Sequence, residues 1–156
     1  MSEVSSLPNR PQIETYLHCD AVSGHAEEWR ERAEAALSKC LENGARLDPQ
    51  PLSELALIEI SLVTDAAIAA VHGEFMDDPT PTDVITFQHG EILVSAETAA
   101  RCAPQHGHSP EREAWLYLIH GMLHLNGYDD TTESARREME AIQNRILNEV
   151  SPFLPG

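Results

Sequence analysis

The 156-residue sequence is poor in basic residues, and lysine is almost missing from it. Ten Lys and Arg residues stand against 26 Asp and Glu residues, which gives a formal net charge of −16, and Lys39 is the sole lysine. Such a charge repels an anionic polymer at long range, so the composition argues against broad nucleic-acid binding. A local site is compatible with this charge, because the Debye length at physiological salt is about 8 Å. Arginine side chains or a bound metal ion must then bind any phosphate group.

Long apolar runs are also missing, and cysteines are few. The best candidate for a membrane span, residues 55–63, is shorter than the roughly 20 apolar residues that a span requires, and it contains Glu59. The first residues show no basic stretch followed by an apolar one, so we expect no secretory signal. The sequence has three cysteines, an odd number, and they are widely spaced: Cys19, Cys40 and Cys102. This pattern is typical of free thiols in a reducing compartment. We therefore expect a cytoplasmic protein without a membrane partner.

Periodicity and helix-capping residues predict one α+β domain. We assign residues 1–11 to a disordered lead-in, 12–150 to the domain and 151–156 to a tail, since the length suits a single core. The expected order of elements is β-α-β-α-β-β-α-α-α, which indicates a mixed sheet of about four strands with helices packed on it. The expected bounds are 13–17, 25–41, 55–63, 65–75, 84–87, 92–94, 95–102, 110–125 and a last helix ending near 150. The helix over 110–125 is apolar around most of its circumference, so it should be a central buried helix.

The most informative stretch of the sequence lies at the end of this helix and reads His120-Gly-Met-Leu-His124-Leu-Asn-Gly127-Tyr-Asp-Asp130. Histidines four residues apart share one helix face with Cβ atoms about 5–6 Å apart, so both can bind one ion at Zn–N distances of about 2.0–2.1 Å. Gly127 can end the helix in a left-handed conformation and let the chain bring Asp130 to the same ion. Three protein ligands plus water is the catalytic arrangement of zinc. We predict one zinc ion on His120, His124 and Asp130, with another divalent metal as an alternative.

Each of these residues also has a structural explanation. The two histidines could instead be core residues bonded to main-chain carbonyls, but each unsatisfied polar group would cost roughly 1–3 kcal/mol in this apolar helix. Asp130 precedes Thr-Thr-Glu133, which resembles a capping box, so it could cap the last helix rather than bind a metal. Asp129 is the adjacent alternative ligand.

Other features of the sequence offer alternatives to this site. A zinc-peptidase helix carries a glutamate directly after its first histidine as the general base, and this sequence has Gly121 there. Peptide hydrolysis therefore needs a base from elsewhere and is the third hypothesis. His106 and His108 could reach a metal, yet their place before a helix-capping serine favours a loop role. The scattered histidines are interpreted as surface or structural residues: His18, His25, His72 and His89.

Two blocks of the sequence carry a family resemblance. The first runs from Gly107-His108-Ser109 to Ile119-His120-Gly-Met-Leu-His124-Leu-Asn-Gly-Tyr-Asp129, and the second is Pro81-Thr-Asp-Val-Ile-Thr-Phe87. They resemble the patterns G-H-S, V-H-G-x-L-H-L-x-G-Y-D-H and P-T-D-V-L-S-F of the YbeY family, bacterial metal-dependent endoribonucleases associated with maturation of ribosomal RNA. The resemblance covers about residues 55–147. It implies an α+β fold, zinc on three histidines, hydrolysis of single-stranded RNA, and a ribosomal RNA precursor or the ribosome as partner.

Three positions depart from the family pattern. Asp130 stands at the third histidine; its carboxylate can bind zinc, but its charge should make a bound water less acidic or favour a harder metal. Met76 stands where an arginine is usual, and a thioether does not hold a phosphate. Val71-His72 replaces a typical Leu-Asn pair.

The resulting hypothesis is a YbeY-like metal-dependent endoribonuclease that acts in ribosomal RNA maturation or ribosome quality control. RNA would enter a groove between residues 82–87 and the metal-binding helix, and Arg112 is a candidate for the missing basic contact. The alternative is a non-catalytic ribosome-assembly or RNA-binding factor that retains the fold, because of Met76 and Asp130.

Overall fold

The computed structural model describes residues 10–45 and 47–150, and one sheet forms its centre. The strands are β1 (Gln12–Leu17), β2 (Leu57–Val63), β3 (Val84–Phe87) and β4 (Glu91–Ser95), in the spatial order β1-β2-β4-β3. β1, β2 and β4 are parallel to one another, whereas β3 runs antiparallel to β4. The predicted α+β class and mixed sheet are therefore confirmed. Residues 1–9 of the predicted lead-in and 151–156 of the predicted tail lie outside the described residues.

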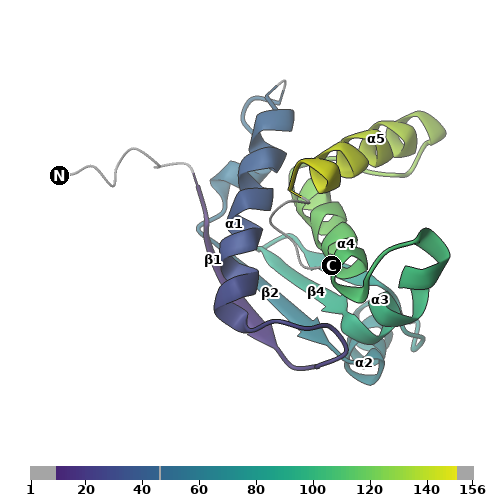
Figure 1. Cartoon of the computed structure of the whole chain (residues 1–156). Helices are drawn as coiled ribbons and strands as arrows, with labels where there is room; N and C mark the ends of the chain where they lie inside the picture. Colours follow the sequence, from purple (N-terminus) through teal and green to yellow (C-terminus); the bar gives the residue numbers. More distant parts are fainter. Residues whose placement is uncertain (1–9, 46, 151–156) are drawn as a thin grey trace.

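The helices divide between the two faces of the sheet. They are α1 (Ala26–Asn43), α2 (Asp65–Met76), α3 (Ala96–Cys102), α4 (Pro110–Leu125) and α5 (Glu133–Val150). In Figure 1, α1 and α4 cross one face of the sheet, and α5 packs beside them. Side chains alternate along a strand, so Ile60 and Ile92 enter the large core under α1 and α4. Leu93 points the other way, into a smaller core with Ile68 of α2.

The predicted elements are all present, with bounds shifted by a few residues. Two short 3-10 helices were not predicted, η2 (Pro51–Glu54) and η3 (Ala103–His106). Four residues are too few to carry a hydrophobic period, which explains the omission. Among the helices that the structure describes, none has both the length and the apolar character needed to cross a membrane. All three cysteines are free thiols, and burial raises the pKa of Cys40 to about 12.

Local sequence fixes both ends of α4, the central buried helix. Ser109 caps its start, since the Ser109 Oγ accepts a hydrogen bond from the Arg112 N–H, and Pro110 occupies the first turn. Past Leu125, Gly127 takes a positive φ of 98°, which lets the chain reverse. Gly121 lies against the sheet, because a Cβ there would be 3.1 Å from methyl groups of Ile92 and Thr86. This close approach places His120 beside the rim of the sheet.

Candidate metal centre

The end of α4 and the turn that follows bring the three predicted ligands together. One ligand atom from each of His120, His124 and Asp130 lies within 4.8 Å of the other two. The two imidazole rings are 5.0 Å apart between centroids and inclined at 78°. Both histidines are half-buried and Asp130 is exposed, so the site is open to solvent on one side. Metal binding by these residues stays a prediction, and the donor set is one that suits a catalytic ion.

Hydrogen bonds leave one ring nitrogen of each histidine for an ion. The Nδ1 of His120 lies 2.7 Å from the Oε1 of Gln143 on α5. An amide oxygen only accepts, so His120 donates its Nδ1–H and keeps the Nε2 lone pair. His124 hydrogen-bonds the main chain of Tyr128. Ligating histidines in metalloproteins are typically held in this way by a partner on the second nitrogen.

The charge state of His124 also suits coordination. Burial lowers the pKa of His124 below its ordinary value, and the neighbouring His120 lowers it further. A histidine must be neutral to offer a lone pair to a metal. At neutral pH the ring therefore needs no deprotonation before an ion binds.

The structure excludes one of the two roles that the sequence left open for Asp130. Thr132 caps α5 instead, because the Thr132 Oγ1 accepts from the Ala135 N–H at 3.0 Å. The capping interpretation of Asp130 is therefore wrong: the helix begins at Glu133, two residues later than a cap at Asp130 requires. Asp129 is engaged locally, since its Oδ1 accepts from the Thr131 N–H at 3.1 Å and from the Thr131 hydroxyl at 2.9 Å. Asp130 is the carboxylate that reaches the histidines.

A hollow of about 300 Å³ lies beside this site. Asp83 and Val84 border it at the start of β3, His120 lines it from α4, and Gln143 lines it from α5. The hollow thus lies where the sequence places a groove, between residues 82–87 and the metal-binding helix. Binding of RNA in it remains a prediction.

A second polar cluster joins His106 and His108 to Glu113, which the sequence analysis did not predict as a site residue. His106 and His108 each place Nδ1 at 2.8 Å from a different oxygen of Glu113, whose side chain is fully buried. His106 is the last residue of η3, and His108 lies in the short loop between η3 and α4. The sequence does place Glu113 on the helix stripe that carries the metal-site histidines. Tyr117, His120 and His124 follow it by 4, 7 and 11 positions.

Other residues singled out in the sequence lie in ordinary surroundings. Arg112 donates to the Asn148 Oδ1 at 2.9 Å and so contacts α5, and it does not line the hollow. Met76 is 48% exposed at the end of α2. The scattered histidines have structural contacts or lie on the surface: His18 stacks on Tyr16, His25 caps α1, His72 bonds the Thr80 carbonyl and His89 bonds Glu91.

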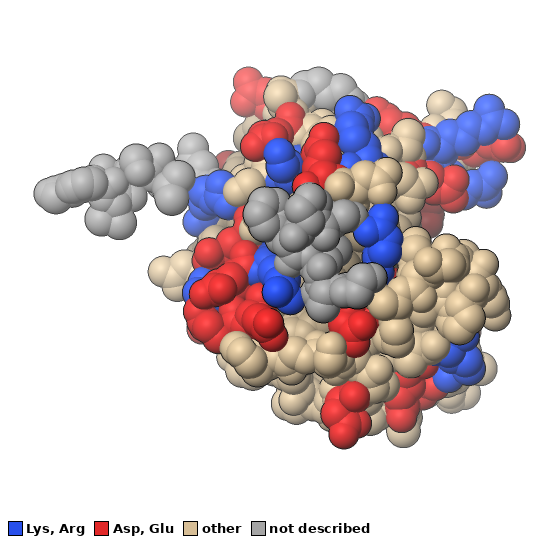
Figure 2. Space-filling model, viewed as in Figure 1, with Lys and Arg blue, Asp and Glu red and all other residues tan. Residues whose placement is uncertain are grey.

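Charge is unevenly spread over the surface. Acidic side chains gather over the N-terminal half of α1, whereas a broad area over the segment that follows α3 is tan in this view (Figure 2), and residues 103–109 contain no Asp, Glu, Lys or Arg. The segment after α3 contains His106, which borders the hollow beside the metal site. The segment that follows α3 therefore adds no carboxylate to the hollow, whose lining carboxylates are Asp83 and Glu113.

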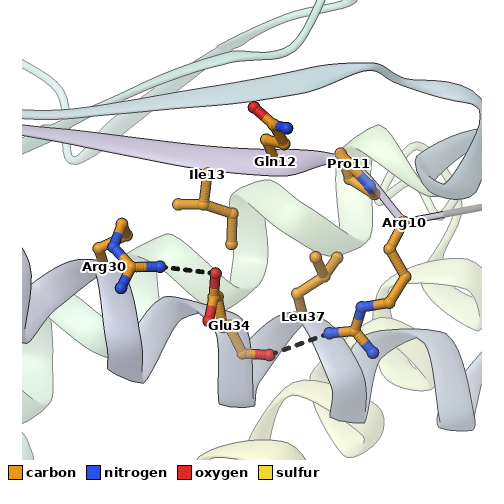
Figure 3. A pocket seen from close by; sticks show the side chains of 7 residues that line it. All are labelled: Arg10, Pro11, Gln12, Ile13, Arg30, Glu34 and Leu37. Atoms are coloured by element: carbon orange, nitrogen blue, oxygen red, sulfur yellow. Dashed lines mark hydrogen bonds and ion pairs between the residues drawn. The ribbon is translucent and has the colours of Figure 1, made fainter. Parts of the chain in front are cut away.

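A larger hollow of about 490 Å³ between β1 and α1 has no such chemistry. Figure 3 shows that its two arginines are engaged with the protein: Arg30 pairs with the Glu34 carboxylate, and Arg10 donates to the Glu34 carbonyl. Arg10 also donates to the Ser38 hydroxyl at 2.7 Å. Within residues 10–45 and 47–150, the groups able to hold a metal are the two clusters on α4 and its flanking segments.

Comparison with known proteins identifies the family. The family model for Endoribonuclease YbeY matches residues 20–151. Endoribonuclease YbeY of Heliobacterium modesticaldum is 33% identical over 142 residues, which cover 78% of this chain and 82% of the relative. The Micrococcus luteus protein of the same name is 36% identical over 122 residues, 68% of this chain and 76% of the relative. The solution structure of a Thermotoga maritima protein superposes with a TM-score of 0.56 at 26% identity and 88% coverage of both chains.

Proposed function

Because the chain belongs to the YbeY family, we propose that it is a metal-dependent endoribonuclease that hydrolyses phosphodiester bonds in single-stranded RNA. The relatives are named for endoribonuclease activity. The observation that carries the proposal is the convergence of His120, His124 and Asp130 beside a hollow that is open to solvent. By the family relationship, the substrate is a ribosomal RNA precursor, and the enzyme acts in the cytoplasm.

The donor set supports zinc as the ion. Two imidazoles and one carboxylate form a common catalytic zinc set, with a fourth position left for water or substrate. When bound, the ion supplies Lewis-acid chemistry at a phosphoryl oxygen. The side chains of this protein orient that site: Gln143 holds the His120 ring, and the reversal at Gly127 presents Asp130. The negative charge of Asp130 makes a harder divalent metal the second candidate.

A non-catalytic ribosome-assembly factor is the competing function. Two observations favour it: the exposed Met76 offers no charge to a phosphate, and Arg112 is engaged with α5. In that case the fold and the ion would serve binding alone. The same purified protein distinguishes the two functions, since only the enzyme breaks the RNA chain.

The test uses the full chain, stripped with a chelator and then reloaded with zinc, on an end-labelled single-stranded RNA. We expect cleavage by the reloaded protein, no cleavage by the stripped protein, and a loss of more than about 100-fold in His120→Ala. His89→Ala, a surface histidine purified identically, is the matched control and should cleave as wild type does. A His120→Ala protein that cleaves at the wild-type rate refutes the enzyme. A reloaded wild-type protein that binds the RNA without cutting it favours the assembly factor.

A further inference from the structure

Glu113 and His106 form one side of the hollow beside the metal site, and His108 contacts Glu113 from outside the hollow. His106 and Glu113 line the same hollow as His120. The Glu113 carboxylate is fully buried, and each of its oxygens lies 2.8 Å from the Nδ1 of one histidine, His106 or His108. A third donor is Tyr117, whose pKa is raised well above its ordinary value by burial and by its hydrogen bond to Glu113. A buried carboxylate with three donors is a rigid anchor.

The distances favour shared protons over a shared metal ion in this cluster. Its three residues are close enough together to hold an ion. However, two ligands of a tetrahedral zinc with bonds of about 2.0–2.1 Å lie roughly 3.3 Å apart, whereas both N···O separations here are 2.8 Å. This shorter separation is that of a charge-assisted N–H···O hydrogen bond. We therefore treat Glu113 as the acceptor of two imidazole N–H groups.

The two histidines differ in what their second nitrogen meets. The His106 side chain is 52% exposed and borders the hollow, whereas that of His108 is 18% exposed and does not line it. With Nδ1 tied to Glu113, the Nε2 of His106 lies on the ring edge turned away from the carboxylate. A buried carboxylate that orients an imidazole, whose other nitrogen then handles a proton, is the arrangement used in hydrolytic triads.

We propose that His106 is the general acid of the hydrolysis and that Glu113 is its positioning residue, an inference that rests on the proposed function. In the step, a water oxygen forms a bond to phosphorus, and the bond from phosphorus to the leaving ribose oxygen breaks with its electron pair. That oxygen takes the proton from the His106 Nε2, and the imidazolium becomes a neutral imidazole that still donates Nδ1–H to Glu113. The attacking water releases its proton to solvent, which later reprotonates His106.

The surroundings of His106 match this role. Residues 103–109, which carry His106, contain no acidic side chain that would repel an RNA phosphate, and the surface over this segment is tan in Figure 2. The titratable groups around the hollow and His106 are few, namely Asp83, Cys102, Glu113, Tyr117 and His120, with His108 behind Glu113. A general acid typically contributes 10²–10⁴-fold to the rate.

The experiment compares two substrates that differ in their need for an acid. Zinc-loaded His106→Gln should cleave single-stranded RNA about 10²–10⁴-fold more slowly than wild type. It should hydrolyse bis(4-nitrophenyl) phosphate at nearly the wild-type rate, because 4-nitrophenolate leaves without a proton. The variant should also bind the same amount of zinc as wild type does.

His108→Gln is the matched control, since it breaks the same kind of bond to Glu113 without changing a group in the hollow. A structural effect lowers the rates on both substrates together, and this is what we expect of His108→Gln. If His106→Gln behaves in the same way, or cleaves RNA as wild type does, the inference is overturned while the proposed function stands. Loss of a bound zinc ion in His106→Gln would make it a ligand and would also overturn the inference. If zinc-loaded wild type cleaves neither substrate, the proposed function fails and this inference with it.

Discussion

Replacing Gln143 with leucine should weaken zinc binding, although Gln143 is not one of the proposed ligands. Its Oε1 lies 2.7 Å from the Nδ1 of His120 and fixes both the tautomer and the orientation of that ring. Leucine has a similar size but cannot accept a hydrogen bond. The His120 ring would then be free to turn, and its Nε2 would no longer be held toward His124 and Asp130.

The size of the effect follows from the geometry. Loss of an outer partner of a ligating histidine typically costs 10–100-fold in metal affinity, or about 1.4–2.7 kcal/mol. Both His120 and Gln143 are half-buried, so water can replace part of the lost bond. We therefore expect the lower part of the range, about a 10-fold rise in the zinc dissociation constant.

Competition with a chromophoric chelator at pH 7 measures this constant directly. Gln143→Glu keeps an acceptor for the His120 N–H, so it should bind zinc at least as tightly as wild type. Asn144→Ala changes the exposed neighbour on α5 and serves as the matched control, with no expected effect. If Gln143→Leu binds zinc as tightly as wild type does, Gln143 does not orient the site.

Three further changes test other parts of the account. Asp130→His should raise the zinc-dependent rate of RNA cleavage near pH 7, because a neutral ligand leaves more positive charge at the site; rates across a pH series check this. Although burial raises it, hydrogen bonds from Ser95, Thr98 and Arg101 together bring the pKa of Asp65 down to about 2. This pKa is below that of Asp in the unfolded chain, so the ionised carboxylate stabilises the folded protein. Asp65→Asn should therefore lower the free energy of unfolding by about 2 kcal/mol above pH 4. In denaturant titrations, this difference between variant and wild type should vanish as the pH falls to about 2. Gly121→Ala should lower the free energy of unfolding by about 1 kcal/mol, measured by the same denaturant titration. Overpacking of the new methyl group against Ile92 and Thr86 costs about 1–3 kcal/mol, and the higher helix propensity of alanine offsets about 1 kcal/mol of this cost.

Local patterns explain why most of the fold could be predicted. Ser109-Pro110 and Thr64 mark helix starts by side-chain capping, and the structure shows both caps. The β3–β4 hairpin follows from two apolar runs separated by a glycine turn. The strand order could not be predicted in the same way, because the pairing of β2 with both β1 and β4 depends on contacts between distant segments.

In the candidate site, too, the features set by local sequence could be predicted and those set by contacts between distant segments could not. The spacing of His120 and His124 is local, so the sequence alone brings both rings to one face of α4. The role of Asp130 depended on where α5 begins, and the turn between Asp129 and Thr131 decides that start. Glu113 was missed because an acidic residue in the first turn of a helix is usually a surface group that favours the dipole. Its burial follows from His106 and His108, which the loop brings over it.

Anomalous diffraction at the zinc edge, from crystals of the full chain grown with zinc, tests the central claim most directly. The account predicts one peak bonded to a nitrogen of His120, a nitrogen of His124 and an oxygen of Asp130, at about 2.0–2.2 Å from each. Crystals in excess zinc that show no peak there, with the His120 ring still bonded to Gln143 and the His124 ring to the main chain, would contradict it.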